Sequence, residues 1–573
     1  MRHDAKTCTS GEQSRALIRS SKKRSWTSYV SGINKPESLS TTMWKDIKRL
    51  SGNSSFHMIS QLKTNSQILS SPPDIAELLA KHFANTSSDN NYDNHFLTHK
   101  NQSESTPTNF DTNEDHSYNR PISLPELHLA IHKNLRNASP GPDKIHASML
   151  KNPHPNSLSY LLSLFNTILI QNTYPLPWKL AIILPILKPQ KDPSLPDSYR
   201  PIALTSVLGK LFQKILNKRL IWYLEHNNII SPFQYGFRKG RNTLQALIDL
   251  QQQINDATTA NATLYTIFFD LQQAFPRVWR HYICQKLHQI GLRGNLPKLL
   301  QSFLQERTIT VRIQDQLSSH HIIQNGIPQG DVWSVPLFLI AINDITKCVA
   351  FPLTQRLFAD DFSISLQSSH PHRAARLLQH TLDKISSWSS DRGYRFSSQK
   401  TGLVIFKKHR RRLPLIPPLL LQGFTINTFS KYKFLGLTFD HKLSWTPHIK
   451  ILKAKCVNTL KIIKYLSHPR IGCNRKLLLQ LYKSLIRSQL DYGSPIYTQA
   501  CKSTTKLLDS IQTSALRLSL GAFRTSPHLS LCAEAGEPTL HFRSLAITAN
   551  FLASAAQFTH LPIYTPIITK PNP

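Results

Sequence analysis

The chain has 573 residues, and 69 Lys and Arg against 33 Asp and Glu give it a formal net charge of +36. This length exceeds one compact core, so we expect two to four domains or subdomains. The basic excess predicts a polyanionic partner, by default nucleic acid, with a ribosome-like structural role or a membrane surface as alternatives. No uncharged apolar run reaches about 18 residues, which predicts no transmembrane helix. The first residues also lack an apolar signal region.

The seven cysteines are scattered, with no C-x-x-C pair and no Cys/His cluster at zinc spacing. An odd number of thiols in a long chain is typical of a reducing compartment. We therefore expect an intracellular protein, nuclear or cytoplasmic or both, that has no membrane partner.

The first part of the chain, 1–120, is predicted to be a basic and polar connector that is partly disordered. It includes the basic run "SSKKRSW", and one helix is expected at "DIAELLAKHFA", beginning near Asp74 after two prolines. Residues 86–118 are polar and poor in aliphatic side chains, which predicts a flexible linker or a long loop. A folded body is expected from Pro121 onward.

Three stretches of this body are typical of strands. "ATLYTIFFD" ends at Asp270, "LFADDFSISL" contains the doublet Asp360 and Asp361, and "KTGLVIF" begins at Lys400. Apolar and polar residues alternate after the doublet, which is the pattern of a half-buried strand. We therefore expect the doublet at a hairpin turn with a strand on each side.

Helical patterns flank these strands. One helix is predicted from Pro276 to Gly291, and another ends near Gly393. The resulting order, strand and helix followed later by two strands, a helix and a strand, predicts an α+β fold. Its core would be a ferredoxin-like split βαβ sheet covered by helices.

The three aspartates Asp270, Asp360 and Asp361 could meet if their strands are neighbours. Clustered carboxylates repel one another unless hard cations lie between them, and Mg²⁺ prefers such oxygen ligands. Two metal ions held in this way suit in-line displacement at phosphorus. Taken alone, an Asp-Asp pair is more often a solvated turn, and Asp270 could be a helix N-cap, so the surrounding motifs decide.

Those motifs, "FFDLQQAF", "GIPQGDVWSVPLFLIAIND" and "FADD" in this order, resemble a reverse transcriptase of non-LTR retrotransposons, particularly the arthropod jockey type. Collinear similarity runs from "SPGPDKIHASMLK" to "LLDSIQTSALRLSLGAFRTSP". The resemblance implies a right-hand polymerase with a ferredoxin-like palm sheet. Its reverse transcriptase domain would cover 121–440, with fingers at about 121–255 and palm at about 256–440, and a helical thumb and C-terminal extension would cover 441–573.

The activity implied is RNA-directed DNA synthesis, in which dNTPs are added to a primer 3′-hydroxyl with two Mg²⁺ ions, or Mn²⁺ as a substitute. The implied partners are an RNA template, a DNA primer or target, and dNTPs; the oligomeric state stays open. "FKKHRRRL" and "KILKAKCVNTLKIIKYL" could line a duplex channel, although each run alone is more typical of a solvated face.

The resemblance also assigns roles to single residues. The metal ligands would be Asp270, Asp360 and Asp361, and Lys400 would protonate the leaving pyrophosphate unless it is a solvated strand-edge lysine. Residues at the nucleotide would offer a carbonyl to a metal, exclude a ribose 2′-hydroxyl, bind the triphosphate or line the template–nucleotide groove. Leu271 would offer its carbonyl, and Phe275 would exclude the 2′-hydroxyl unless it only packs in the core. Arg200, assisted by Lys188 or Lys191, would bind the triphosphate. The groove would be lined by Gly326, Gln329 and Gly330.

Five positions depart from the family pattern. Pro276 replaces a usual Asp, Gln213 replaces a Glu, and Asp331, Trp333 and Val335 stand where Ser, Leu and Pro are usual. We expect Asp331 to add negative charge beside the nucleotide site and Trp333 to add bulk next to the template groove. These changes favour one rival hypothesis, a catalytically impaired nucleic-acid-binding remnant; a second rival is a telomerase or group II intron enzyme.

The stretch "TTMWKDIKRLSGN" resembles the connector that follows an apurinic-like endonuclease in jockey-type elements. We therefore expect a product that lacks the N-terminal endonuclease. No acidic set typical of RNase H follows the predicted thumb.

Overall fold

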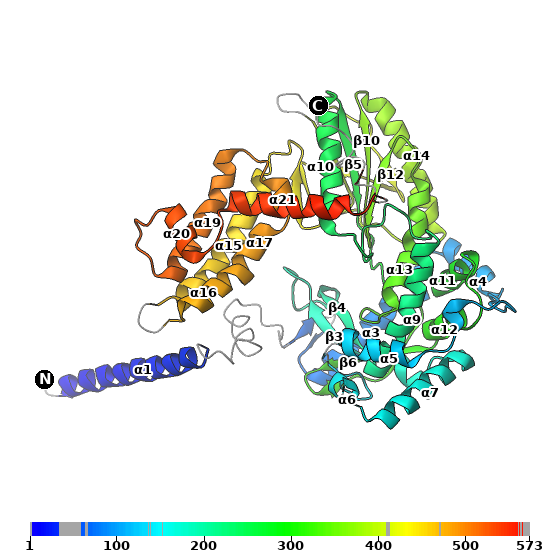
Figure 1. Ribbon diagram of the computed structural model, residues 1–573, viewed down its shortest axis with the longest axis horizontal. Coiled ribbons are helices and arrows are strands. Elements are labelled where there is room, and N and C mark those ends of the chain that lie inside the picture. Colours follow the sequence, from blue (N-terminus) through cyan, green and yellow to red (C-terminus); the bar gives the residue numbers. More distant parts are fainter. Residues whose placement is uncertain are drawn as a thin grey trace. The chain divides into compact units, whose positions relative to one another are not determined.

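The computed structural model describes residues 3–33, 59–63, 67–135, 137, 139–151, 153–407, 413–468, 472–559, 561 and 564. The chain divides into two compact units, a larger one at His57–Ser430 and a smaller one that joins Lys431–Pro573 to Met1–Phe56. Helices and strands alternate in the larger unit, whereas the smaller unit is almost entirely helical (Figure 1). The "TTMWKDIKRLSGN" stretch and residues 408–412 of "FKKHRRRL" lie outside the described residues.

The central sheet of the larger unit has five strands in the order β14-β11-β5-β10-β9. Numbered along the chain, the four antiparallel strands β5, β9, β10 and β11 lie in the order fourth, first, third, second, which is the ferredoxin-like order. All three predicted strands are therefore confirmed. The strands are β5 (Thr263–Phe269), β9 (Thr354–Phe358), β10 (Asp361–Ser368), β11 (Gly402–Phe406) and β14 (Asn427–Thr428).

Helices cover both faces of this sheet. The helix α14 (Pro371–Ser390) packs on the face where Ile364 and Leu366 enter the main core. Residues of a strand alternate between faces, so Ser363 and Ser365 point the other way, toward α10 (Thr243–Thr259). There Asp249 of α10 pairs with Arg356 of β9. Figure 1 shows α10 and α14 on either side of the strands.

A second sheet, called the side sheet here, has the strand order β4-β3-β6-β7, with β8 also paired to β6. The helix α3 (Pro72–Thr86) packs on it through an apolar stripe that includes Ile75 and Leu79. The helix predicted to begin near Asp74 begins at Pro72, so the two prolines occupy its first turn. The strands are β3 (Leu180–Leu187), β4 (Tyr199–Leu204), β6 (Arg307–Ile313), β7 (Gln316–Leu317) and β8 (His321–Ile323).

The linker expected at 86–118 is wrong, because part of it forms helix α4 (Asn94–Glu104). The Asp93 side chain caps this helix by accepting a hydrogen bond from the Phe96 amide at 2.8 Å. The Phe96 ring is fully buried and lies edge-on to Trp279, with ring centroids 5.4 Å apart. One buried aromatic side chain and a good N-cap thus order a segment whose composition is polar.

The remaining helices of the larger unit contribute side chains to the main core or pack against it, and the apolar helix α13 is buried there over most of its length. The helix predicted from Pro276 begins instead at Arg280, and Pro276 lies in the preceding turn. These helices are α5 (Leu124–Leu129), α6 (Ala147–Lys151), α7 (Pro155–Gln171), α8 (Leu176–Lys179), α9 (Val207–His226), α11 (Arg280–Gln289), α12 (Asn295–Leu304) and α13 (Ser334–Ile342). Two small hairpins complete the unit: β1 (Leu62–Lys63) with β2 (Ile68–Leu69), and β12 (Leu420–Leu421) with β13 (Phe424–Thr425).

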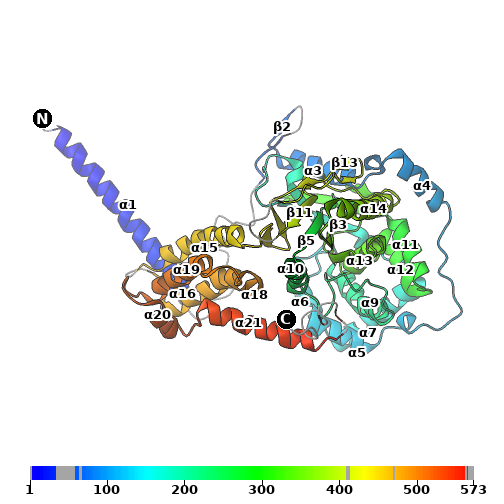
Figure 2. The ribbon, with the colours of Figure 1, turned by 90° about the horizontal axis from the view of Figure 1, so that it is seen from above.

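The smaller unit is a helical bundle preceded by one hairpin, β15 (Lys431–Phe434) with β16 (Leu437–Asp440). Within this unit α15 packs against α19, and the two helices lie side by side in Figures 1 and 2. None of the described helices of the chain is long and apolar enough to cross a membrane. The helices of this unit are α1 (His3–Ile33), α15 (Thr446–Leu466), α16 (Arg475–Leu481), α17 (Ser488–Asp491), α18 (Ser494–Tyr497), α19 (Lys502–Leu520), α20 (His528–Ala535) and α21 (Leu540–Ala556).

Candidate active site

The three candidate aspartates lie at one edge of the central sheet. Asp270 directly follows β5, and the pairing of Phe269 with Phe362 places Asp361 opposite it on the adjacent strand. Asp360 occupies the two-residue turn between β9 and β10, next to Ala359, whose φ is +56°. The hairpin turn predicted for the doublet is therefore confirmed, and the topology brings the three carboxylates together.

Burial and, after it, like charge raise carboxylate pKa values at this edge. Burial raises the pKa of Asp360, and the Asp270 carboxylate adds to the rise. Burial, followed by repulsion from Asp360 and Asp270, raises the pKa of Asp361 to about 6, although its side chain still reaches solvent. The Lys400 ammonium lies 3.2 Å from Oδ2 of Asp270 and partly offsets the charge. One lysine beside three carboxylates leaves a site that attracts further cations.

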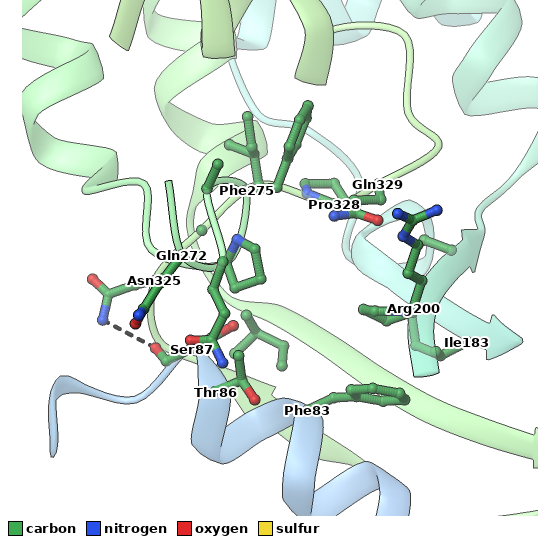
Figure 3. A pocket seen from close by; sticks show the side chains of 18 of the residues that line it. Phe83, Thr86, Ser87, Ile183, Arg200, Gln272, Phe275, Asn325, Pro328 and Gln329 are labelled. Carbon is green, nitrogen blue, oxygen red and sulfur yellow. Dashed lines mark hydrogen bonds between the residues drawn. The ribbon is translucent and has the colours of Figure 1, made fainter. Parts of the chain in front are cut away.

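A pocket of about 480 Å³ opens beside the carboxylates and is lined by both acidic and basic side chains. Figure 3 shows Arg200 and Gln329 on one side of it, with Thr86, Ser87 and Gln272 on the other. Most of the predicted site residues line this one pocket, whereas Asp361, Gly330 and Lys191 do not. Those that do are Arg200, Asp270, Leu271, Phe275, Gly326, Gln329, Asp360 and Lys400.

The sequence left Lys188 and Lys191 as alternatives, and only Lys188 lines the basic wall of the pocket. Lys188 lines the pocket, where its Nζ donates a hydrogen bond to the Asp197 carbonyl at 2.8 Å. Burial lowers the pKa of Lys188; Asp197 opposes this change, while Arg200 and Lys400 add to it. Lys188, Arg200 and Lys400 therefore form a cationic group that can bind an anion near the carboxylates.

Leu271 and Phe275, which follow Asp270 in the chain, form the adjoining wall of the pocket. The Phe275 ring stacks on Phe338, with ring centroids 4.4 Å apart and planes inclined by 8°, and it is half-buried. It therefore packs against the core and also lines the pocket. Leu271 forms a bridge with Phe396, which fixes the backbone beside Asp270.

The loop "NGIPQG" reaches the pocket through close backbone contacts. Gly326 has a φ of +79°, and a Cβ there would lie 2.5 Å from the Pro276 carbonyl oxygen. Gly330 has a φ of +125°, and its Cβ would lie 2.7 Å from the Ala203 carbonyl oxygen. The Ala203 amide in turn donates to the Gln329 carbonyl at 2.9 Å. Gly326 thus allows close approach of the Pro276 backbone, and Gly330 allows close approach of Ala203 in β4, which holds the loop against the side sheet.

Two departures from the family pattern lie below the pocket and not in it, which corrects the sequence expectation. Asp331 is buried, pairs with Arg307 at 3.1 Å and accepts a hydrogen bond from the Thr205 hydroxyl. Trp333 is fully buried, with its ring edge-on to Phe303 at 5.2 Å. The charge of Asp331 is therefore compensated, and the bulk of Trp333 fills the core and not the groove.

The glutamine at position 213, where the family usually has glutamate, is explained by its hydrogen bonds. It is buried, its Nε2 donates to the Tyr174 hydroxyl at 2.7 Å, and its Oε1 accepts from the Val332 amide at 2.9 Å. The neutral amide satisfies both partners without placing a charge in this buried position.

The sequence reasoning missed part of the pocket wall. His82, Phe83, Thr86 and Ser87 at the end of α3 line the pocket, although this segment was assigned to a connector. The apolar face of α3, which the sequence does display, was the signal that this helix joins the folded body.

Arg280 also lines the pocket and was not predicted. Its guanidinium donates to the carbonyls of Gly326 at 2.7 Å, Ile323 at 2.9 Å and Asn325 at 3.1 Å. Burial lowers its pKa to about 9, with repulsion from Arg307 in the same direction. Arg280 therefore holds the loop that carries Gly326, a role that no sequence pattern announces.

The carboxylate oxygens at this edge suit a hard divalent cation, since the raised pKa values of Asp360 and Asp361 show that their charges are incompletely compensated. Within the described part of the chain, no group of three or more His, Cys, Asp or Glu side chains is arranged to hold a metal ion. The chemistry of the donors thus fits Mg²⁺, while the carboxylates do not enclose an ion in this arrangement.

Comparison with known proteins agrees with this geometry. Residues 186–439, which include all three aspartates, match the reverse transcriptase (RNA-dependent DNA polymerase) family. The RNA-directed DNA polymerase from mobile element jockey of Drosophila melanogaster is 29% identical over 407 residues, covering 70% of this chain and 44% of the relative.

Two further relatives come from Drosophila melanogaster, the probable RNA-directed DNA polymerases from transposon BS and from transposon X-element. Each is 28% identical and matches 70% of this chain and 44% of its own length. The chain thus spans less than half the length of these curated relatives. Residues 186–439 are thus similar to the reverse transcriptase family, and the chain is similar to the RNA-directed DNA polymerases of transposable elements such as jockey and transposon BS.

Proposed function

We propose that this chain is an RNA-directed DNA polymerase that adds dNTPs to a primer 3′-hydroxyl on an RNA template. One observation carries the proposal: Asp270, Asp360 and Asp361 meet at the edge of a ferredoxin-like sheet, beside a pocket with a cationic wall. Negative and positive groups side by side suit a reaction that must bind metal ions and a polyphosphate together.

The three aspartates would hold two divalent cations, and reverse transcriptases generally use such ions. When bound, the cations would lower the pKa of the primer hydroxyl and neutralise charge on the phosphates. Mg²⁺ is the ion we propose, with Mn²⁺ as a substitute. Leu271 would add its backbone carbonyl to the carboxylate ligands.

The chain's own cations act on the triphosphate. Arg200 and Lys188 bind its oxygens, Arg200 through the planar fork that suits phosphate. As the primer 3′-hydroxyl gives up its proton to solvent water and its oxygen bonds to the α-phosphorus, the bond to the bridging oxygen breaks and pyrophosphate leaves with both electrons. Lys400 leaves its ion pair with Asp270 and gives that oxygen a proton.

The groove residues select the substrate. Phe275 lies under the sugar, where a flat ring held by Phe338 leaves no room for a 2′-hydroxyl. Gly326 and Gln329 contact the template–nucleotide pair, and Gly330 keeps their loop against Ala203. In this proposal, residues 121–255 act as fingers, 256–440 as palm, and 441–573 as a thumb whose lysines on α15 contact duplex phosphates.

Primer extension tests the function directly. Purified protein with poly(rA)/oligo(dT), dTTP and Mg²⁺ is expected to lengthen the primer, and omission of the divalent ion is expected to abolish the product. Salt-sensitive binding of primer–template without extension would instead favour the nucleic-acid-binding remnant. The buried positions of Asp331 and Trp333 remove the main support for that remnant, and the jockey-type relatives favour the mobile-element hypothesis over a telomerase or intron enzyme.

A further inference from the structure

A short segment before α10, residues 229–236, lies along the hairpin that carries Asp360. The Tyr235 amide donates to the Leu357 carbonyl at 2.7 Å, and the Leu357 amide donates to the Phe233 carbonyl at 3.0 Å. Gln234 thereby pairs with Leu357 in a parallel bridge. The segment extends the central sheet beyond β9, at the end where the catalytic turn lies.

The Gln234 side chain reaches from this segment into the turn. Its Oε1 accepts hydrogen bonds from the Ala359 amide at 2.9 Å and from the Gly236 amide at 2.8 Å. Ala359 has the left-handed φ of +56°, which a residue with a Cβ adopts only where its surroundings hold it. Gln234 is 1% exposed, so water does not compete for these hydrogen bonds.

Close contact reinforces the hydrogen bonds. A Cβ on Gly236 would lie 2.5 Å from the Ala359 nitrogen and 3.1 Å from the Phe358 carbonyl carbon. The backbone of Gly236 therefore touches the turn directly. Any movement of the 233–236 backbone would be passed to Ala359 and from there to Asp360, the next residue.

The segment is itself anchored away from the turn. The Arg241 guanidinium donates to the Gln234 carbonyl at 3.2 Å, and the Arg238 guanidinium donates to the Ser231 carbonyl at 2.8 Å. The Ser231 amide donates to Oδ1 of Asn343, which follows α13, at 2.8 Å. Gln234 thus projects from a fixed support onto a turn that needs one.

We infer that Gln234 is a positioning residue that holds the Ala359–Asp360 turn so that the Asp360 carboxylate faces Asp270. The inference rests on the proposed polymerase function and adds a residue to it. Without the carboxamide oxygen, the buried Ala359 amide loses its acceptor and the left-handed turn can relax. A displacement of about 1 Å at a catalytic group lowers a rate by about 100-fold.

The test is Gln234→Met, which keeps the length of the side chain and removes both acceptor and donor. We expect kcat for primer extension to fall by about 10-fold to 100-fold, as for other residues that orient metal ligands. The KM for dTTP and the Kd for primer–template should change by less than about twofold, since neither contact involves this residue. Mn²⁺ affinity, followed by electron paramagnetic resonance without substrates, should fall by about 10-fold.

The matched control is Gln512→Met in the smaller unit. Gln512 is equally buried, and its Nε2 donates to the Tyr482 hydroxyl at 3.1 Å and the Pro538 carbonyl at 2.9 Å. The Gln512→Met substitution removes a comparable buried carboxamide from the other unit. It is expected to lower the melting temperature as Gln234→Met does, without changing Mn²⁺ affinity.

The outcomes separate this inference from the proposed function. If wild type extends primers and Gln234→Met matches it in kcat and Mn²⁺ affinity, the positioning role is overturned and the polymerase function stands. If wild type makes no product, the polymerase function fails, and the Mn²⁺ titration alone decides the positioning role. Should Gln234→Met not fold, Gln234→Glu keeps the acceptor oxygen. Near wild-type Mn²⁺ affinity in that variant supports the inference, and a 10-fold loss overturns it.

Discussion

The surroundings of Asp331 differ sharply from those of the three aspartates Asp270, Asp360 and Asp361 at the sheet edge. The charge of Asp331 is compensated by an ion pair with Arg307 at 3.1 Å and a hydrogen bond from the Thr205 hydroxyl. Asp360 and Asp361 lie near Asp270, and burial together with like charge raises their pKa values. The counter-charges near that edge are Lys400, which is two-thirds exposed, and Arg200, and they offset the rise only in part.

The difference separates a structural charge from a functional one. A buried carboxylate with its own guanidinium stabilises only the arrangement that contains both. Carboxylates that raise each other's pKa values cost stability and are retained where a ligand supplies the missing charge. The identity of the residue is the same in both groups, so the surroundings alone make the distinction.

The largest loss of activity is expected from replacing Asp360, one of the two aspartates with a raised pKa. Asp360→Asn should lower primer extension by about 1,000-fold or more, because it removes a metal ligand. The same change removes like-charge repulsion, so the melting temperature should stay the same or rise. Primer extension and thermal unfolding measure the two effects. Extension at more than a tenth of the wild-type rate would contradict the metal assignment.

The paired group should respond in the opposite sense. Asp331→Asn leaves Arg307 buried without its counter-charge and should lower the free energy of unfolding by about 3 kcal/mol. The folded fraction should extend primers at a near wild-type rate, since Asp331 does not line the pocket. Denaturant unfolding measures the first effect, and the double variant with Arg307→Met should recover part of the loss.

A stable Asp331→Asn protein with a changed KM for dNTP would contradict this comparison. It would return Asp331 to the nucleotide site, where the sequence alone had placed it.

The sequence predicts the parts of the site that depend on local patterns and misses those that depend on distant contacts. Period-2 alternation after Asp361 and the apolar run before Asp270 predict the strands and the hairpin correctly, since both patterns are local. Nothing local to Asp331 reveals that Arg307 will lie beside it, because that contact joins a loop to the start of β6. Arg280, Gln234 and α4 were missed for the same reason, since each depends on partners distant in the chain.

The cations of the pocket extend the comparison to positive charge. Lys188→Met should raise the KM for dTTP about 10-fold, because a charge-assisted hydrogen bond to the triphosphate is lost. Lys191→Met is the matched control: Lys191 is exposed and does not line the pocket, so its loss should change that KM by less than about twofold. Steady-state kinetics measure both. Equal effects would mean that general positive charge, and not the pocket, binds the nucleotide.

The smallest expected effect is the pH dependence of stability at Asp361. Its pKa in the folded protein is about 6, above the ordinary value of 3.8, so the fold favours the protonated form. The stability that this provides is fully present below pH 3.8 and is lost as the pH rises through 6. The loss should not exceed about 1 kcal/mol, because solvent screens the exposed part of the carboxylate.

Denaturant unfolding at pH 4 and pH 7 measures this loss, with Asp361→Asn as the control that cannot titrate. The variant should gain stability relative to wild type as the pH rises. Primer extension should follow the opposite sign and increase through pH 6, because only the ionised carboxylate holds a cation. Mg²⁺ competes with the proton, so adding it should move the midpoint of activity to lower pH. Parallel stability profiles for the two proteins would mean that Asp361 is solvated and independent of its neighbours, as Asp-Asp pairs in surface turns are.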